Sequence, residues 1–335
     1  MRHSPVAMSP VTAGFTALMS RLRTPVETLD LAEIQAGRGF AYPARPPFTW
    51  VTGTVDPVVG ITYGTAPARD GYEVPLRIYR PREARDSETD IPVVVFLHGG
   101  GWVQGNVVAY DPLCTHLARR VRAVVVSVDY RMAPEHKAPA AAHDCIDATR
   151  WVAGHAAVLR ADTSRLAVCG DSAGGNLAAV LAQAARDEGG PRILHQSLVY
   201  PATDLTLASP SIDEHADAPM LTRANILAFR RHYLPEGADL TSPVLSPLFG
   251  DLAGLPPALI QTADLDPLRD DGLRYADALR AAGVPTRLTN YVRVPHGFAS
   301  FPGATPIGAQ HRAELVHELR SHLYAAGGDG APPPR

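Results

Sequence analysis

The sequence predicts an α/β fold in which a mostly parallel sheet is covered by helices on both faces. Solid Val/Ile/Leu runs of strand length recur from residue 91 onward, and such runs are typical of parallel strands buried on both faces. Helix-like patterns alternate with these runs over about 230 residues, as in α/β folds. A chain of 335 residues is long enough to bury one large core in a single domain.

The strand-like runs fall into two groups. Early runs at 50–55, 59–64 and 74–80 alternate or are short, as in antiparallel edge strands. The later runs are continuous and predict buried parallel strands at 91–98, 123–130, 165–170, 193–200, 257–263 and 286–292. Helical patterns between them predict helices at 111–121, 138–158, 174–187, 268–282 and 306–326.

Two segments interrupt this alternation of strands and helices, residues 1–45 and roughly 203–250. Within the first, an apolar helical face is predicted over residues 11–22, formed by Val11, Phe15, Leu18, Met19 and Leu22. The second contains a predicted helix at 222–234 with a similar face. We expect both to lie over the carboxyl edge of the sheet, where open α/β sheets bind ligands. The tail 327–335, "GGDGAPPPR", is expected to be disordered.

Composition excludes several function classes. The net charge of −3 gives no electrostatic reason to expect nucleic acid or an anionic membrane as a partner. No apolar run approaches the ~18 residues of a spanning helix, so stable membrane insertion is not expected. Cys114, Cys145 and Cys169 are far apart and odd in number, which favours reduced thiols in a cytoplasmic protein over a disulfide framework or zinc site. Cys169 is expected to be a small buried strand residue.

A serine lies in a glycine-rich turn, "CGDSAGGN", between a predicted strand and a predicted helix. Gly170, Ser172 and Gly174 form G-x-S-x-G, the pattern of a nucleophile exposed on a sharp strand-to-helix bend. Glycine is needed at the flanks because side chains there would clash with neighbouring backbone. The alternative is a structural turn in which Ser172 only caps the helix.

A second glycine-rich stretch, "FLHGGGW", ends an earlier strand with His98 followed by Gly99, Gly100 and Gly101. Consecutive glycines allow backbone N–H groups to approach a developing oxyanion without obstruction. A flexible turn is the alternative. A phosphate-binding loop is disfavoured, since neither G-x-x-x-x-G-K-[ST] nor G-x-G-x-x-G is present.

Four acids after the strand at 257–263 are candidates for the group that orients a catalytic base: Asp264, Asp266, Asp270 and Asp271. Asp266 precedes Pro267, so it could equally cap the following helix. Capping and catalysis are compatible roles for one carboxylate.

The candidate base is His296, in a loop after the last strand. If the chain order is Ser, Asp, His, only three other histidines qualify: His311, His317 and His322. These lie in a charged amphipathic pattern and are expected to be solvated. The predicted triad is then Ser172 as nucleophile, His296 as base and Asp266 as the residue that holds the imidazole.

Together these motifs resemble the hormone-sensitive-lipase family of α/β-hydrolases, in its bacterial esterase branch with the G-D-S-A-G form. The resemblance covers roughly residues 60–325 and rests on "HGGGW", "VDYRMAPEHKAPAA", "GDSAGGN", "LPPALIQTADLDPLRDDG" and "HGF". It implies an α/β-hydrolase fold with a mostly parallel eight-stranded sheet flanked by helices. The catalytic domain would comprise 46–202 and 241–326, and a helical cap would comprise 1–45 and 203–240.

The resemblance also assigns roles within the site. It selects Asp266 over Asp264 as the acid and implies oxyanion donors at the backbone of Gly100, Gly101 and Ala173, with His98 structural. The implied activity is carboxylic ester hydrolysis of short- to medium-chain acyl esters through an acyl-serine intermediate. It implies no metal and no organic cofactor. The expected partner is a small-molecule ester, and a homodimer is compatible with the family.

Two alternatives remain. The same triad could serve a deacetylase or amidase-like hydrolase, or an acyltransferase with an acceptor other than water. The family that the sequence resembles also includes a plant hormone receptor that has lost the catalytic histidine. Because this chain keeps His296, the resemblance disfavours a non-catalytic ligand receptor.

Overall fold

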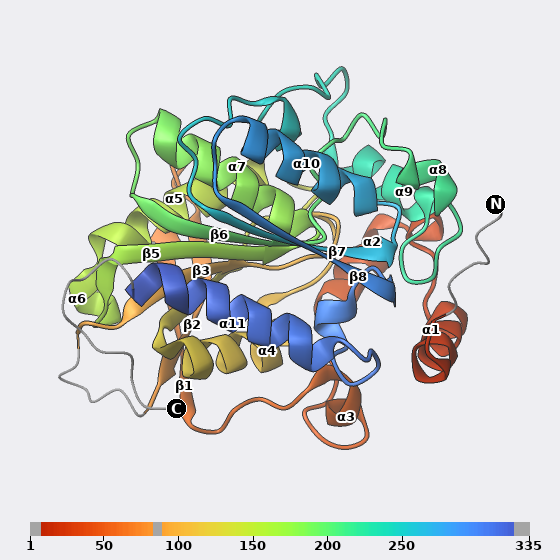
Figure 1. Ribbon diagram of the computed structural model, residues 1–335, viewed down its shortest axis with the longest axis horizontal. Helices are drawn as coiled ribbons and strands as arrows, with labels where there is room; N and C mark the ends of the chain where they lie inside the picture. The colour runs from red at the N-terminus through yellow and green to blue at the C-terminus, as the bar shows by residue number, and fades with distance from the viewer. Residues whose placement is uncertain (1–7, 83–88, 325–335) are drawn as a thin grey trace.

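An eight-stranded sheet forms the centre of the computed structural model, which describes residues 8–82 and 89–324 (Figure 1). The predicted tail at 327–335 lies outside the described residues. The strands run in the order β1-β2-β4-β3-β5-β6-β7-β8. Their bounds are β1 Val59–Pro67, β2 Glu73–Pro81, β3 Pro92–Leu97, β4 Val124–Val128, β5 Asp162–Asp171, β6 Ile193–Val199, β7 Ala258–Leu265 and β8 Thr286–Pro295.

The first two strands are antiparallel and the rest of the sheet is parallel, as predicted. β1 pairs antiparallel with β2, and β2 pairs antiparallel with β4. From β4 to β8 all pairings are parallel. Every residue of β3 is buried, which explains its unbroken apolar sequence, because both faces of a central parallel strand are covered.

Helices cover both faces of the sheet (Figure 1). On one face lie α5 Ala140–Gly154, α7 Ala173–Asp187 and α10 Arg269–Ala281. On the other lie α4 Asp111–Leu117, the π-helical turn η3 Ala118–Arg122 and α11 Gly308–Tyr324. Alternate residues of β3 enter two separate apolar clusters, Val93 and Val95 on one side and Val94 and Phe96 on the other. This alternation follows from the two-residue period of a strand.

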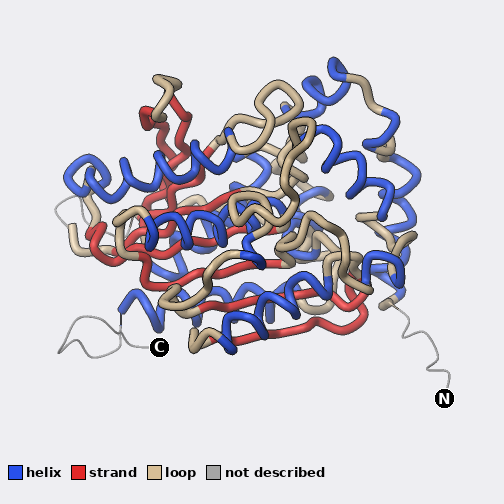
Figure 2. The backbone as a smooth tube through the Cα atoms, turned by 90° about the horizontal axis from the view of Figure 1, so that it is seen from above, coloured by secondary structure: helices blue, strands red, loops and turns tan. Residues whose placement is uncertain are grey.

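Four further helices, α1 Pro10–Leu22, α2 Leu31–Arg38, α8 Ser211–Glu214 and α9 Arg223–Tyr233, gather at the carboxyl end of the parallel strands, on the right of Figures 1 and 2. These helices come from the two segments, residues 1–45 and roughly 203–250, that interrupt the alternation of strands and helices. The 3₁₀ turn η1 Val26–Thr28 packs against α9, and the Asn225 amide donates to Glu27 Oε2 at 2.8 Å.

The strand expected at 50–55 is wrong, because this stretch begins in a short helix, α3 Phe48–Thr52. Its aromatic and β-branched residues resemble a strand, but no neighbouring strand pairs with it in the described chain. Gly53, at φ +86°, ends the helix with an N–H bond to the Thr49 carbonyl. The short helix α6 Ala156–Leu159 and the 3₁₀ turns η2 Val107–Tyr110, η4 Pro247–Phe249 and η5 Phe298–Ser300 complete the elements.

Helix α1 forms where expected but presents a different face to the protein. Val11, Leu18 and Leu22 are 65%, 52% and 70% exposed, whereas the buried residues are Thr12, Thr16 and Met19. The Thr12 hydroxyl donates to the Ala304 carbonyl at 2.9 Å, and Phe15 packs on Phe301. These specific contacts set the rotation of the helix, and the periodicity of its apolar residues could not reveal them.

Within residues 8–82 and 89–324, no helix combines the length and hydrophobicity needed to cross a bilayer.

Candidate active site

Ser172 lies on the sharp turn between β5 and α7. Its φ of +55° and ψ of −119° place a non-glycine residue in strained backbone, as expected of a nucleophile elbow. A Cβ on Gly170 would lie 2.3 Å from the Gly174 carbonyl oxygen, and one on Gly174 would lie 2.0 Å from the Leu97 carbonyl oxygen. Both flanks therefore require glycine, which is the reason inferred from the sequence.

The Ser172 hydroxyl is directed to His296 and does not cap α7. Ser172 Oγ lies 2.9 Å from His296 Nε2, and its side chain makes no capping bond. His296 Nδ1 lies 2.7 Å from Asp266 Oδ2. Because an ionised carboxylate only accepts hydrogen bonds, Nδ1–H donates to Asp266 and leaves Nε2 free to accept from Ser172. The three side chains thus form one hydrogen-bonded chain.

Asp266 is fully buried and makes two kinds of contact. Oδ1 accepts from the Leu268 backbone N–H at 2.8 Å while Oδ2 faces His296. The first bond holds the carboxylate at the start of α10, so a structural role and a role toward the imidazole coexist. Asp264 accepts from the Val294 N–H at 3.2 Å. The structure therefore brings Asp266, and not Asp264, to His296.

The other two candidate acids hold the segment that follows β6. Asp271 is buried and accepts from the N–H groups of Thr203 and Asp204 and from the Ser209 hydroxyl. Burial raises the pKa of Asp271 to about 7. Asp270 accepts from the Ser211 N–H at 3.0 Å. Neither contacts His296.

The three backbone N–H groups predicted as oxyanion donors, those of Gly100, Gly101 and Ala173, have no other acceptor in the described structure. Ala173 is the first residue of α7, where N–H groups have no partner inside the helix. Gly101 and Ala173 line the same cavity as Ser172. Glycine is required at 100 and 101, where φ is +127° and +61° and a Cβ would strike Gln104 or Phe229.

Asp171, the neighbour of the nucleophile, has a part in the site that the sequence did not reveal. It is buried, and its carboxylate accepts from the Gly99 N–H at 2.9 Å and from the hydroxyls of Tyr110 and Tyr200 at 2.9 and 3.3 Å. The carboxylate therefore fixes the start of the glycine loop. Tyr200 also packs on the His296 ring, with ring centroids 4.4 Å apart. The only sequence signal was an acidic residue inside a buried turn.

Burial raises the pKa of Asp171 to about 6, which predicts a pH-dependent stability. The folded chain binds this proton more tightly than the unfolded chain. The contribution of protonated Asp171 to the free energy of unfolding is therefore fully present below about pH 4. It is lost as pH rises through about 6, and the total loss is about 3 kcal/mol. Asp171→Asn removes this dependence, so the variant should gain stability relative to wild type between pH 4.5 and 7.5. Thermal unfolding at both pH values measures the difference.

The control for that measurement is Asp277→Asn, because the Asp277 side chain is 76% exposed. Its difference in stability from wild type should be the same at pH 4.5 and at pH 7.5. A constant difference for Asp171→Asn as well would contradict a carboxyl titrating in the folded state near pH 6.

The cavity beside Ser172 is small and mostly apolar. It encloses about 40 Å³ and is lined by residues of the glycine loop, the nucleophile turn, the segment after β6, and α9. Phe229 of α9 forms one wall, with its ring directly over Gly101. The other apolar walls are Trp102, Ala202, Leu205, Leu207, Leu221, Ile226 and Leu268.

None of the other histidines named from the sequence bonds Ser172. His311 was expected to be solvated, but it is fully buried and bonds the Gln261 amide oxygen at 2.8 Å. The expectation failed because α11 packs a polar network, and not only apolar residues, against β7 and β8. His317 is exposed, and His322 is partly buried. His98 is buried, stacks on Tyr130 and bonds the Gly99 carbonyl.

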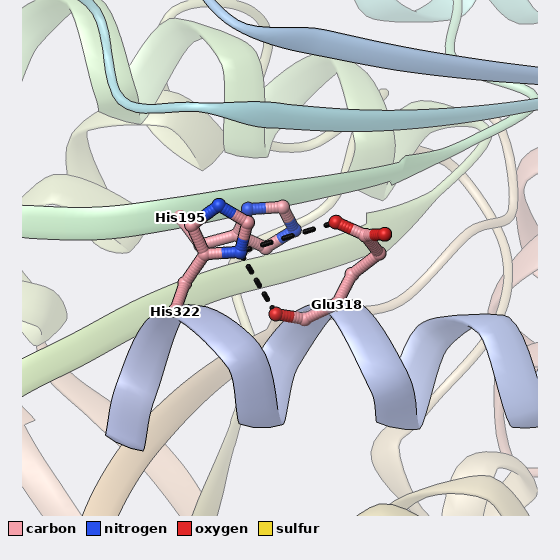
Figure 3. Close-up of side chains that lie close together, drawn as sticks. All are labelled: His195, Glu318 and His322. Atoms are coloured by element: carbon pink, nitrogen blue, oxygen red, sulfur yellow. Dashed lines mark hydrogen bonds and ion pairs between the residues drawn. The ribbon is translucent and has the colours of Figure 1, made fainter. Parts of the chain in front are cut away.

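Among the described residues, one cluster of side chains that could ligate a metal lies outside this site; it is formed by His195 of β6 and by Glu318 and His322 of α11 (Figure 3). The two imidazole rings are stacked, with centroids 4.3 Å apart and planes 17° apart. A metal lies in the plane of each ligating imidazole, and two nearly parallel planes do not meet at one ion. Glu318 also accepts from Arg287 at 3.0 Å. This arrangement does not favour a metal site.

Comparisons with known proteins agree with this geometry. A family model described as alpha/beta hydrolase fold matches residues 94–300. Carboxylesterase NlhH of Mycobacterium tuberculosis is 47% identical over 76% of this chain and 80% of its own length. Ethyl acetate hydrolase of Pseudomonas putida is 33% identical over 95% of this chain and 100% of its own length.

Among solved structures, a hyperthermophilic esterase from the archaeon Pyrobaculum calidifontis superposes with a TM-score of 0.85 at 39% identity, covering 94% of this chain and 98% of that chain. The family match spans more than half of the chain, and the sequence relatives extend beyond it. The chain therefore belongs to the α/β-hydrolase fold family and is one of its hormone-sensitive-lipase-like esterases.

Proposed function

We propose that this protein is a serine carboxylesterase that hydrolyses small carboxylic esters through an acyl intermediate on Ser172. The observation that carries the proposal is the hydrogen-bonded chain from Ser172 through His296 to the buried Asp266. The relatives named carboxylesterase and esterase, at 47–48% identity, support the same activity.

In the acylation step, Ser172 Oγ attacks the ester carbonyl carbon as its proton passes to His296 Nε2. The N–H groups of Gly100, Gly101 and Ala173 receive the negative charge that develops on the carbonyl oxygen. Asp266 stabilises the imidazolium and holds its orientation. The C–O bond to the alcohol then breaks, and the alcohol leaves with the proton from His296.

In the deacylation step, water takes the place of the alcohol. His296 Nε2 accepts a proton from water as the water oxygen attacks the acyl carbon. The intermediate then collapses, the bond to Ser172 Oγ breaks, and the serine recovers its proton from His296. The same three residues and the same N–H donors serve both steps.

The small cavity favours short acyl groups within the short- to medium-chain range. A volume of about 40 Å³ leaves little room beyond an acetyl or propionyl group unless the walls move. Phe229 is the largest apolar side chain that α9 contributes to this wall. Acyl length is therefore limited chiefly by the Phe229 ring.

Phe229→Ala is expected to shift the preference of the enzyme toward longer acyl chains. Removing the ring extends the cavity over Gly101. The ratio of kcat/KM for the octanoate ester to kcat/KM for the acetate ester should therefore rise about tenfold or more, because one methylene in an apolar pocket changes the transition-state free energy by about 1–3 kcal/mol. A series of p-nitrophenyl esters from acetate to decanoate measures the ratio.

The matched control is Phe249→Ala, because Phe249 is 42% exposed and does not line the cavity. Its chain-length profile should equal that of wild type. If Phe229→Ala also leaves the profile unchanged, Phe229 does not limit the acyl pocket.

Residues 8–45, the described part of the predicted segment 1–45, and residues 203–240 are proposed to form the cap over this site. Support comes from the contact between η1 and α9, and from the position of Phe229, Ile226 and Leu221 on the cavity wall. A cap there would exclude water from the acyl pocket. A cytoplasmic location and a homodimer remain predictions; all three cysteines are free and buried, as a reducing compartment permits.

Matched substrates separate the proposed function from the alternatives. Hydrolysis of an acetate ester should greatly exceed hydrolysis of the matching acetamide, and added alcohol should not divert most of the acyl group. Faster amide cleavage would favour an amidase-like enzyme. Dominant ester exchange would favour an acyltransferase.

A further inference from the structure

A cationic hollow lies on the sheet face covered by α4 and α11, separate from the cavity at Ser172. It encloses about 760 Å³, within the size range of small-molecule sites. One face of α11 supplies Arg312, His317 and Arg320, η3 supplies Arg120, and α3 supplies Trp50. α3, α4 and α11 lie together in the lower part of Figure 1.

No carboxylate in the described part of the chain is ion-paired with these cations, although Asp56 interacts electrostatically with Arg120 at longer range. None of the residues that line the hollow is acidic. Within the described part of the chain, no Asp or Glu oxygen lies within 4.0 Å of a side-chain nitrogen of Arg120, Arg312 or Arg320. The nearby Asp56 is bound by Arg119 at 2.9 Å. Three arginines therefore line one hollow in a chain whose net charge is −3, and Arg320 Nη1 also donates to the Arg120 and Val121 carbonyls.

Arg312 is the most unusual of the three because its guanidinium is largely withdrawn from water without an acceptor of matching charge. Its Nε is buried with no hydrogen-bond partner, and its Nη2 reaches only the Thr52 carbonyl at 3.5 Å. Burial lowers the pKa of Arg312 to about 10. An unpaired buried cation is costly, and an anion entering the hollow would offset that cost.

We propose that this hollow binds a phosphate ester, with the phosphoryl group held by Arg120, Arg312 and Arg320 and the organic part lying against Trp50. Guanidinium groups match phosphate oxygens with paired, charge-assisted hydrogen bonds. A dianionic phosphoryl group compensates three cations better than a single carboxylate. The Trp50 side chain is 72% exposed and offers a flat apolar surface for an aromatic ring.

The wall of the hollow connects it to the loop that follows His296. Pro302 and Gly303 of that loop line the hollow, and the Gly303 N–H donates to the Val51 carbonyl of α3 at 3.0 Å. A bound ligand would therefore contact α3, α11 and this loop together. Binding can be measured without any carboxylic ester, so the proposal stands or fails independently of the proposed function.

The test is isothermal titration of the full chain with phenyl phosphate and with inorganic phosphate, at constant ionic strength set by sodium chloride. We expect saturable binding of one phenyl phosphate per chain. Arg312→Gln should weaken binding about tenfold or more, since a hydrogen bond to a charged group contributes at least this much. Arg280→Gln, an exposed arginine on α10, is the control and should leave the affinity unchanged.

Two further variants make the test specific. Trp50→Ala should weaken phenyl phosphate binding and leave inorganic phosphate binding unchanged, because only the ring contacts the indole. Arg120→Gln alters an exposed side chain, so it should fold normally and weaken both ligands. Without ligand, Arg312→Gln should keep the thermal stability of wild type, because it removes a partly buried cation that has no acidic partner in the described part of the chain.

The proposal is overturned if phenyl phosphate shows no saturable binding, or if Arg280→Gln weakens it as much as Arg312→Gln. Benzoate binding as tight as phenyl phosphate would overturn the phosphoryl assignment. Unchanged affinity in Arg120→Gln would overturn the site itself, even if Arg312→Gln fails to fold.

Discussion

Replacing Ser172 or His296 by alanine is expected to lower kcat about 10⁴-fold or more in each case. Ser172→Ala removes the atom that forms the acyl bond. His296→Ala leaves the serine hydroxyl with no base, since Nε2 is the group 2.9 Å from Oγ. The residual rate would come from substrate binding and the backbone N–H donors.

The double variant distinguishes a catalytic unit from two separate contributions. Because the serine and the histidine act on the same proton, the double variant should lose little beyond either single variant. Ser164→Ala and His322→Ala, which alter the same residue types away from the cavity, should retain wild-type kcat. Losses that multiply in the double variant would contradict the shared role.

Asp266→Asn is the second change with a large expected effect, a fall in kcat of about 10⁴-fold. Asparagine can donate through its amide and would favour the wrong tautomer of His296, in which Nε2 carries the proton and cannot accept from Ser172. Asp264→Asn should have a much smaller effect, because Asp264 contacts the Val294 N–H and not the imidazole.

Steady-state kinetics and thermal unfolding of both variants separate the two roles of Asp266. A catalytic role lowers kcat with the melting temperature little changed. A lower melting temperature with kcat retained would show that the bond from the Leu268 N–H is the only function of this carboxylate. Equal losses in the two variants would contradict the choice of Asp266.

The parts of the fold that depend on local pattern could be predicted from the sequence. The buried parallel strands carry unbroken apolar runs because both faces of the sheet are covered. Glycine flanks Ser172 because a Cβ at either position would lie only 2.0 or 2.3 Å from a backbone carbonyl oxygen. The order of Ser172, Asp266 and His296 along the chain was visible because each follows a strand of the same sheet.

Other features depend on tertiary contacts that leave no periodic signal. The rotation of α1 is set by the bond from Thr12 to the Ala304 carbonyl, so Val11, Leu18 and Leu22 lie outside. His311 is buried because Gln261 supplies a partner from β7. The role of Asp171 depends on Gly99 and Tyr110, which are distant in sequence. The size of the acyl cavity depends on where Phe229 packs.

The central claim, that Ser172 is an activated nucleophile, is tested most directly by intact mass spectrometry after reaction with an aryl phosphonate ester. We predict one phosphonyl adduct per chain, located by peptide mapping on Ser172, with loss of ester hydrolysis in proportion to labelling. Ser172→Ala should remain unlabelled, and His296→Ala should react far more slowly. An adduct on another residue, or undiminished hydrolysis in a chain fully labelled at Ser172, would contradict the account.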